Sequence, residues 1–327
     1  MQTLPKIELH LHLDCSLSYE AVSAIDPAFT PPRYAREIVA PPRVDDLADY
    51  LARTRVSVAL LQTERALRVA VSDLLQQLAA DGVIYAEIRF APLLHTDQGL
   101  SPENVVRIVV DEADHACART GVDTRLILCT LRHFSEEQDM VTARLIERFR
   151  GSRVVALDLA GDEAGFPLDA HVPAFTFARR HGILCTAHAG EASGPASVRG
   201  TLVRLKPSRI GHGVRSIDDP ALVEHLIARD IHLEVCPACN VQIGIYGSYE
   251  EHPVDRLYRA GVSLSINTDA RAVTPTTLTL DYERLAETFG WTEADFLACN
   301  LNAVAASFAP DDVKAELTLR LRAGYAA

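Results

Sequence analysis

Residues 6–14 read KIELHLHLD, an apolar run that carries two histidines, His10 and His12, and ends at Asp14. Alternate residues of a strand face the same side, so both imidazoles can reach one point. Seven more short apolar runs follow along the chain. Together the eight runs cover residues 6–14, 83–91, 124–133, 153–160, 183–188, 209–212, 231–236 and 262–269. Most are too continuously apolar for a half-exposed antiparallel sheet, which predicts strands that are buried on both faces.

Helical segments are expected between these strands. Residues 44–80 carry apolar side chains at helical spacing and end at Asp81-Gly82, a helix stop signal. Further helices are predicted to begin at Ser101-Pro102, Asp219-Pro220 and Thr292, and the last of them to end at Ala309-Pro310.

The alternation of strand and helix predicts an α/β fold built from parallel βαβ units. Eight such units in one chain favour a (β/α)8 TIM barrel over an open doubly wound sheet. The phosphate-binding pattern G-x-G-x-x-G is also missing after the first strand, which argues further against a dinucleotide-binding sheet. We expect residues 1–327 to form a single barrel domain. The stretch 15–42 exceeds a normal βα loop and predicts a helical insertion after the first strand, with short helices over the barrel mouth.

The charge balance argues against polyanionic partners. The chain has 44 acidic and 32 basic residues, a net charge of −12, and no cluster of Lys and Arg that would bind nucleic acid or anionic lipid. It has no 18-residue apolar run and no signal-peptide pattern at its start. We therefore expect a cytoplasmic protein without a membrane partner. The sequence does not indicate an oligomeric state.

Seven scattered cysteines, an odd number, predict buried reduced thiols rather than a disulfide framework. Only Cys236 and Cys239 form a C-x-x-C pair, and a structural zinc site would need a second pair. With the preceding H-L-E at residues 232–234, this pair superficially resembles the H-x-E…P-C-x-x-C signature of cytidine-type zinc deaminases. We reject that interpretation because Val235 replaces the proline and the cysteines follow Glu234 within the same strand.

Barrel enzymes carry their chemistry at the carboxyl ends of the strands. The first predicted strand ends with His10 and His12, the fifth with His188, and the eighth with Asp269. Three imidazoles and one carboxylate are a donor set that suits Zn²⁺, with a water molecule as an additional ligand. Each residue alone is more often a core histidine or a turn residue, but their shared place at strand ends favours a metal site.

Two further polar residues fall on the same face of the predicted barrel. Glu191 follows the fifth strand, and His212 ends the sixth within Gly-His-Gly. Because neither residue belongs to the proposed metal ligands, they are the candidate acid and base beside the metal. Taken alone, Glu191 would be interpreted as a loop carboxylate and His212 as a turn residue. The other eight histidines fall mostly in helical or loop segments, and we expect rings such as His115, His181 and His225 to be solvated.

Nine sequence motifs together resemble the adenosine deaminases of the amidohydrolase superfamily, over nearly the whole chain. They are ELHLHLD (8–14), YAEIRFAP (85–92), DLAGDE (158–163), HAGE (188–191), RIGHG (209–213), Cys236-Pro237 with Asn240, NTD (267–269), TTL (276–278) and LNAVAASF (301–308). No single motif is specific, but their common order is. The resemblance implies a metal-dependent hydrolase barrel that deaminates a purine nucleoside.

The resemblance also implies a role for each matching residue. One zinc ion per chain would be bound by His10, His12, His188 and Asp269. His212 would orient and deprotonate the zinc-bound water, and Asp269 would also help to hold the attacking hydroxyl. Glu191 would protonate the ring nitrogen next to the amino-bearing carbon, which requires a raised pKa of the kind that a closed site supplies.

Substrate contacts are also implied. Asp14 matches the residue that contacts the ribose, and because enzymes for free adenine tend to carry Glu there, it favours a nucleoside. Gly161 lies where the family's backbone closely approaches the purine. Ala270 replaces a second Asp that normally contacts the imidazole side of the purine, and losing this hydrogen bond would weaken binding by about 1–3 kcal/mol. Cys15, where the family usually has Gly, is a further departure.

Four functions remain open from the sequence. The leading one is deamination of adenosine or deoxyadenosine. A second is the same chemistry on a 5′-modified adenosine such as aminodeoxyfutalosine, with Arg271 either meeting a substrate carboxylate or forming a surface salt bridge. A third is a non-catalytic nucleoside-binding protein, which the intact acid, base and metal ligands argue against. The fourth is ester or amide hydrolysis. Glu191 argues against it, because a carboxyl beside His188 is what protonation of an aminopurine ring requires.

Overall fold

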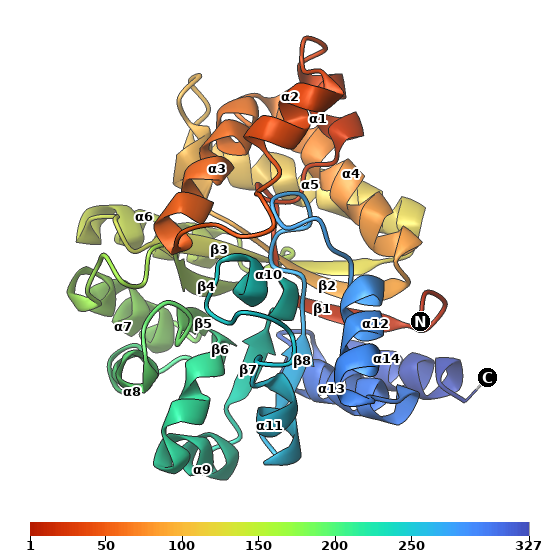
Figure 1. Ribbon diagram of the computed structural model, residues 1–327. Coiled ribbons are helices and arrows are strands. Elements are labelled where there is room, and N and C mark those ends of the chain that lie inside the picture. Colours follow the sequence, from red (N-terminus) through yellow and green to blue (C-terminus); the bar gives the residue numbers. More distant parts are fainter. Residues whose placement is uncertain (327) are drawn as a thin grey trace.

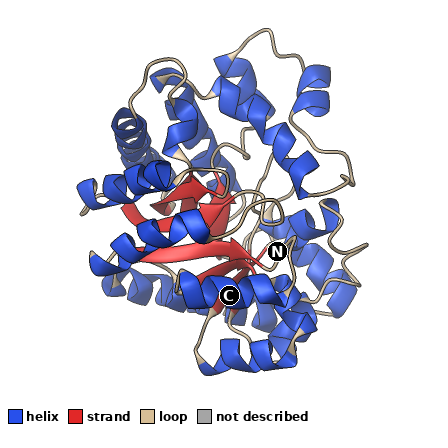
Figure 2. Ribbon diagram, turned by 90° about the vertical axis from the view of Figure 1, so that its left-hand side faces the viewer, coloured by secondary structure: helices blue, strands red, loops and turns tan. Residues whose placement is uncertain are grey.

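A computed structural model describes residues 1–326 of the chain. Eight parallel strands are hydrogen-bonded in chain order from β1 to β8. A bridge between Leu11 and Asp269 joins the two ends of this series. The strands lie inside and the helices surround them (Figure 1, Figure 2). This arrangement confirms the predicted (β/α)8 barrel.

All eight predicted runs overlap an observed strand. The strands are β1 (Lys6–His12), β2 (Val83–Phe90), β3 (Asp123–Leu131), β4 (Val154–Ala160), β5 (Leu184–Ala189), β6 (Arg209–His212), β7 (His232–Val235) and β8 (Leu264–Ile266). The predicted run exceeds the observed strand by most at β8, where only three residues of the run 262–269 form a strand. Beyond the end of this strand, Asp269 adopts a left-handed backbone conformation, with φ of 63°.

Helices connect successive strands. They are α1 (Tyr19–Ile25), α2 (Pro31–Glu37), α3 (Leu47–Leu60), α4 (Glu64–Ala80), α5 (Pro102–Thr120), α6 (Glu136–Arg148), α7 (Val172–Arg180), α8 (Pro195–Arg204), α9 (Pro220–Ala228), α10 (Pro237–Gln242), α11 (Val254–Arg259), α12 (Leu278–Phe289), α13 (Glu293–Ala306) and α14 (Asp311–Gly324), with 3₁₀ turns η1 (Pro92–His95), η2 (Asp169–His171) and η3 (Val214–Asp218). The predicted starts are confirmed, since Ser101, Asp219 and Thr292 are N-cap residues.

Two helical predictions were incomplete. Residues 44–80 contain two helices, α3 and α4, rather than one. The first ends at Leu60 with Leu61 as its C-cap, and Thr63 caps the second by accepting a hydrogen bond from the N–H of Ala66. Beyond Pro310, which was expected to end the helical region, the chain begins the additional helix α14. A proline at this position is compatible with a helix start because its missing N–H has no helical partner there.

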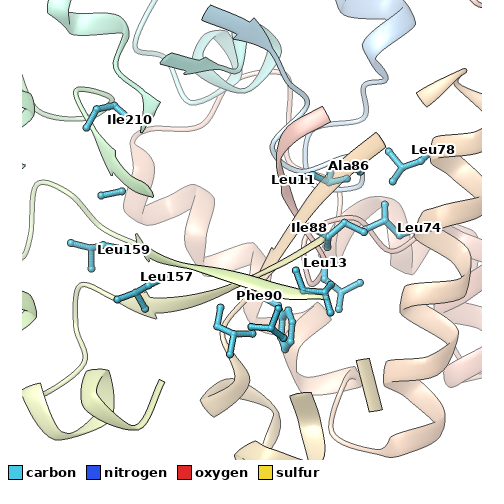
Figure 3. Packing of buried hydrophobic residues seen from close by; sticks show 14 of the residues in the cluster. Leu11, Leu13, Leu74, Leu78, Ala86, Ile88, Phe90, Leu157, Leu159 and Ile210 are labelled. Carbon is cyan, nitrogen blue, oxygen red and sulfur yellow. The ribbon is translucent and has the colours of Figure 1, made fainter. Parts of the chain in front are cut away.

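The core lies between the strands and the surrounding helices. Leu74 and Leu78 of α4 pack toward Ala86 and Ile88 of β2 (Figure 3). All four side chains are at most 1 % exposed. Burying each leucine contributes about 1.5–3 kcal/mol relative to the exposed side chain, so this layer fixes α4 against the barrel.

The long segment after β1 contains the short helices α1 and α2. The α1 helix packs on α4, and the Tyr34 hydroxyl of α2 donates to the carbonyl of Leu17 at 2.8 Å. The two chain ends lie on one side of the barrel (Figure 1). Asn300 links them, because its Oδ1 accepts from the N–H of Ile7 at 2.7 Å and its Nδ2 donates to the Tyr325 hydroxyl at 3.1 Å.

Two sequence predictions concern the chain as a whole. All seven cysteines are free thiols, as expected. Among the helices of residues 1–326, none combines the length and the apolar composition that a membrane span requires.

Candidate active site

Four predicted metal ligands converge at the carboxyl end of the barrel. The Nε2 atoms of His12 and His188 lie 3.2 Å apart. The Oδ1 atom of Asp269 lies 3.3 Å from His10 Nε2 and 3.4 Å from His12 Nε2. One donor atom from each of the four residues lies within 4.8 Å of all the others. The structure thus brings together side chains from β1, from β5 and from the segment after β8.

The donor set fits a tetrahedral metal ion. Ligands about 2.0–2.1 Å from a tetrahedral centre are about 3.3 Å from one another, which matches the separations seen here. His10 Nε2 is buried and has no hydrogen-bond partner. His10 Nδ1 lies 2.8 Å from Glu234, and His188 Nδ1 lies 3.0 Å from the carbonyl of Leu159. Both rings therefore donate from Nδ1 and keep an Nε2 lone pair for an ion.

A buried charge network lies beneath this cluster. Arg89 lies between two carboxylates, 2.6 Å from Glu234 and 3.1 Å from Asp158. Arg209 contacts Glu234 at 2.7 Å and Glu87 at 2.6 Å. Burial alone would raise the pKa of Glu234, but Arg89 and Arg209 outweigh it and hold this pKa well below its ordinary value. The network keeps the partner of His10 as a carboxylate.

The sequence analysis did not identify this network. The sequence does contain an indication of the network, because Arg89 is a charged residue inside the apolar run of β2 and Glu234 is a charged residue inside the apolar run of β7. Arg and Glu are almost never fully buried unless they are paired. Both are fully buried here.

Glu191 and His212 lie beside the metal-ligand cluster. Glu191 Oε1 is 3.4 Å from His212 Nδ1. Burial raises the pKa of Glu191 well above its ordinary value, and the charges of Asp269 and Glu163 add to this effect. Burial, with a further contribution from His10, lowers the pKa of His212 well below its ordinary value. The pair is therefore poised as a protonated acid beside a neutral imidazole.

The loop that carries Glu191 is fixed by one carboxylate. Glu163 accepts hydrogen bonds from the backbone N–H groups of Gly190, Glu191 and Ser193 at 2.6, 3.0 and 2.9 Å. Three donors on one buried side chain leave the loop little freedom.

Two site residues have unusual backbone conformations. Outside glycine, left-handed conformations are uncommon, and two of the four among residues 1–326 belong to His212 and Asp269, with φ of 59° and 63°.

Asn240 of α10 bridges the acid and the imidazole. Its Nδ2 lies 3.1 Å from Glu191 Oε1 and 3.2 Å from His212 Nδ1. Asn240 belongs to one of the motifs that the sequence analysis recognised, but no role was assigned to it. Its partner His252, 3.2 Å from Oδ1, was not recognised at all.

A cavity of about 480 Å³ opens beside the cluster. Among the predicted site residues, His12, Asp14 and Gly161 line it. Burial raises the pKa of Asp14 to about 6. Ala270 is not among the lining residues and instead packs, 1 % exposed, in a buried cluster with Cys15.

One wall of this cavity comes from α3, part of the segment 44–80 that was predicted to be helical but not to contribute to the site. Leu51, Arg55 and Val58 of α3 line the cavity together with His133 from the β3 end and Phe166. Neither α1 nor α2 contributes a lining residue.

The C-x-x-C pair also lies in the site. Cys236 Sγ is within 4.8 Å of donor atoms of His10, His212 and Asp269, and Cys239 Sγ is equally close to those of Glu191 and Asp269. Burial raises the pKa of both thiols well above the ordinary value, with Asp269 as the next cause. The two cysteines are therefore neutral thiols that pack around the carboxylates.

The expected solvation of the other eight histidines is half right. His115, His181 and His225 are exposed, as predicted. Four others are buried, namely His95, His171, His232 and His252. Local sequence does not reveal such burial because each ring is enclosed by segments distant in the chain.

Arg271 does not reach the cavity. Its side chain is 2 % exposed, with Nη2 2.8 Å from Asp81 and Nη1 3.8 Å from Glu8. Asp81 in turn accepts from the N–H groups of Leu278 and Thr279 at the start of α12. The expectation that Arg271 meets a substrate carboxylate is therefore wrong, and its salt bridge is buried rather than on the surface.

Comparisons with known proteins agree with this geometry. The sequence model of the family described as adenosine deaminase matches residues 5–323. The adenosine deaminase of Lacticaseibacillus paracasei is 37 % identical over 333 residues, covering 100 % of this chain and 98 % of the relative. The adenine deaminase of Arthrobacter aurescens superposes with a TM-score of 0.91 at 26 % identity, covering 99 % of this chain and 100 % of that one. A zinc-bound amidohydrolase from Burkholderia ambifaria shares the fold, with a TM-score of 0.89 at 22 % identity over 100 % and 94 % of the chains.

Proposed function

The chain belongs to the adenosine deaminase family, and we propose that it hydrolyses adenosine or deoxyadenosine to inosine or deoxyinosine and ammonia, with zinc. One observation carries the proposal. A buried carboxyl with a raised pKa, Glu191, lies beside a cluster of three imidazoles and Asp269 whose spacing suits a tetrahedral ion. A proton donor next to a metal-water site is what replacing an amino group by a hydroxyl requires.

The proposed metal is one Zn²⁺ per chain. The ligands would be His10, His12, His188 and Asp269, an N₃O set that zinc accepts readily. Bound there, zinc would supply an ionised water at neutral pH. The zinc-bound relative of the same fold supports this assignment.

The chain's own residues account for the remaining chemistry. Glu191 donates its proton to the ring nitrogen next to the amino-bearing carbon, which makes that carbon electrophilic. His212 and Asp269 hydrogen-bond the attacking water and hold it against the same carbon. Water adds to the carbon and gives one proton to the Asp269 carboxylate, which passes it to the amino group. The carbon–nitrogen bond breaks, ammonia leaves, and the remaining hydroxyl proton returns to Glu191. Because burial, Asp269 and Glu163 all raise the pKa of Glu191, the acid is protonated before substrate arrives.

The proposed substrate contacts come from the cavity walls. Asp14 would bind the ribose, and Gly161 would present backbone to the purine, since it has φ of 97° and no side chain to block the approach. Ala270 is not part of the cavity wall, and only from its place next to Asp269 would it face the imidazole side of the purine, without offering a hydrogen bond. Asp14 rather than Glu favours a nucleoside over free adenine.

A second candidate substrate is an adenosine extended at its 5′ position. The observation that favours it is that Arg55 of α3 and His133 line the same cavity as Asp14. These side chains offer hydrogen bonds and, from Arg55, positive charge to a group beyond the ribose. Asp97 and Asp162, which also line the cavity, would limit this charge.

The test is a set of initial deamination rates for the purified zinc protein on adenosine, deoxyadenosine, adenine and a 5′-extended adenosine, with Glu191→Gln as control. Fast turnover of adenosine that the control lacks is the expected result. Turnover of the extended substrate alone would move the proposal to the second candidate. A zinc-loaded protein that binds nucleosides but deaminates none would overturn it in favour of a binding protein.

A further inference from the structure

The orientation of the Asn240 amide is set from outside the site. The backbone N–H of Val254 lies 3.2 Å from His252 Nδ1. A backbone N–H can only donate, so Nδ1 accepts and the proton of the neutral ring is on Nε2. Burial, helped by Arg256, lowers the pKa of His252 to about 3, so the ring is neutral near pH 7. The tautomer of His252 is thereby determined by the main chain.

This tautomer decides which end of the amide faces the site. His252 Nε2–H donates to Asn240 Oδ1 at 3.2 Å. The Nδ2 group therefore faces Glu191 Oε1 at 3.1 Å and His212 Nδ1 at 3.2 Å, and its two hydrogens serve one acceptor each. The reversed amide would place donor against donor at His252, and an acceptor against Glu191 Oε1.

The amide in turn fixes the protons of its two partners. Because His212 Nδ1 accepts from Asn240, the neutral ring carries its proton on Nε2. Such a ring can donate a hydrogen bond to the attacking water but has no lone pair with which to take its proton. Because Glu191 Oε1 accepts from the same amide, the acid keeps its proton on Oε2, the oxygen that is free to donate.

We propose that His252 and Asn240 are positioning residues that hold His212 as an Nε2–H donor and Glu191 as an Oε2–H acid. The inference rests on the proposed function and replaces the base role that the family resemblance implies for His212, because the ring donates to the attacking water and cannot take its proton. Neither residue lines the cavity. Both are at most 2 % exposed, and the Tyr246 ring packs edge-on against His252 with ring centroids 5.0 Å apart.

The direct test is the tautomer itself. The zinc-loaded protein, labelled with ¹⁵N in histidine, is studied by long-range ¹H–¹⁵N NMR, with His212→Gln and His252→Gln used to assign the signals. We expect both rings to carry the proton on Nε2 and a lone pair on Nδ1. A resting His212 protonated on Nδ1 would overturn the proposal, whatever the enzyme's substrate.

A matched pair of variants tests the consequence for catalysis. His252→Gln can still donate to Asn240 Oδ1, whereas His252→Leu cannot. We expect the Leu variant to lose roughly 10- to 100-fold in kcat on adenosine with little change in KM, and the Gln variant to stay within a few-fold of wild type. Zinc content and thermal unfolding of both variants show whether they fold.

The outcomes separate the two proposals. Equal kcat for the Gln and Leu variants, both folded and zinc-loaded, would refute the positioning role. If the Leu variant does not fold, Asn240→Asp, which keeps the size but removes both donated hydrogen bonds, is expected to show the same fall in kcat, and unchanged kcat would refute the role. A wild-type enzyme inactive on every purine would instead refute the proposed function, while the tautomer measurement would still stand.

Discussion

Glu234 Oε2 lies 2.8 Å from Nδ1 of His10 and holds that ring with its other nitrogen toward the metal-ligand cluster. The same oxygen is 2.6 Å from Arg89, so the carboxylate is shared between an imidazole and a guanidinium. All three side chains are fully buried. The orientation of a proposed metal ligand therefore depends on a charge network that never touches the ion.

Replacing Glu234 by Gln should weaken metal binding. The change removes the negative charge behind His10, and loss of such a partner typically lowers metal affinity about 10- to 100-fold. It also leaves Arg89 and Arg209 with less compensating charge, which should lower the free energy of unfolding by about 3–5 kcal/mol. Zinc affinity is measured by competition with a chelator, and stability by urea unfolding.

The matched control for this prediction is Thr186→Val. The Thr186 hydroxyl donates to Glu234 Oε1 at 3.0 Å, so this variant removes one hydrogen bond and no charge. Its zinc affinity should stay within a few-fold of wild type. Equal affinities for wild type and Glu234→Gln would show that the carboxylate does not support the site.

Gly161→Ala should raise KM. With φ of 97°, this glycine is in a region that L-residues rarely adopt, and an added Cβ would lie 3.4 Å from the backbone N of Arg132. We expect a loss of about 1–2 kcal/mol in the free energy of unfolding. Because Gly161 also lines the cavity, KM for the nucleoside should rise several-fold. Gly99→Ala separates the two effects, since Gly99 has φ of 93° and open space around its Cβ position. Gly99→Ala should cost similar stability and leave KM unchanged.

Ala270→Asp should destabilise the protein rather than improve binding. The position is 1 % exposed and packs with Cys15, Cys236 and Cys239. A second carboxylate next to Asp269 would be buried without a partner, at a cost of at least about 2 kcal/mol. Thermal unfolding checks this, with the neutral Ala270→Ser as the comparison for size. A variant as stable as wild type with a lower KM would show instead that the site accepts the acid that the family resemblance implies at this position.

Stability should fall in acid because buried histidines are neutral in the folded protein. Burial, with Arg209 as the next cause, lowers the pKa of His232 to about 3, and burial lowers that of His95 to about 4. The unfolded chain titrates near 6.5, so between these values it binds more protons than the folded chain. The contribution of these two histidines to the free energy of unfolding is thus complete above about pH 6.5 and is lost progressively as the pH drops toward 3.

A variant tests this slope. His232 lies between two serine hydroxyls, 2.9 Å from Ser263 and 2.9 Å from Ser265, so His232→Gln keeps polar contacts and removes one titrating group. Urea unfolding at a series of pH values should show a shallower acid slope for it than for wild type. The exposed His115→Gln should keep the wild-type slope. Identical slopes for all three proteins would contradict the prediction.

The barrel and the convergence of the metal-ligand cluster were predictable because both depend on local patterns. Alternation places His10 and His12 on one face of a strand, and the parallel arrangement brings the ends of β5 and β8 to the same rim. The whole-chain resemblance then indicated which polar residues at that rim to consider. The fold class and the family are both confirmed.

What the sequence did not predict depends on contacts between distant segments. Arg89 shows only that a charge is buried, not that Glu234, 145 residues away, neutralises it. One apparent helix is divided between Leu60 and Glu64, and its first part, α3, forms a wall of the cavity. His252 reaches Asn240 through an irregular segment with no periodic pattern. These partners are chosen by tertiary packing, which local propensity does not encode.

The bridge between Leu11 and Asp269 also has a consequence for how the protein is made. The N–H of Asp269 donates to the carbonyl of His10 at 2.9 Å, and the N–H of His12 donates to the carbonyl of Asp269 at 2.8 Å. A nascent chain emerges from the ribosome with both histidines more than two hundred residues ahead of this aspartate. Until synthesis is nearly finished, the donor set is incomplete and the loop between its members remains unclosed. Binding of the proposed metal would thus be a late event in biogenesis, and a chain that ends before Asp269 would lack one member of this donor set.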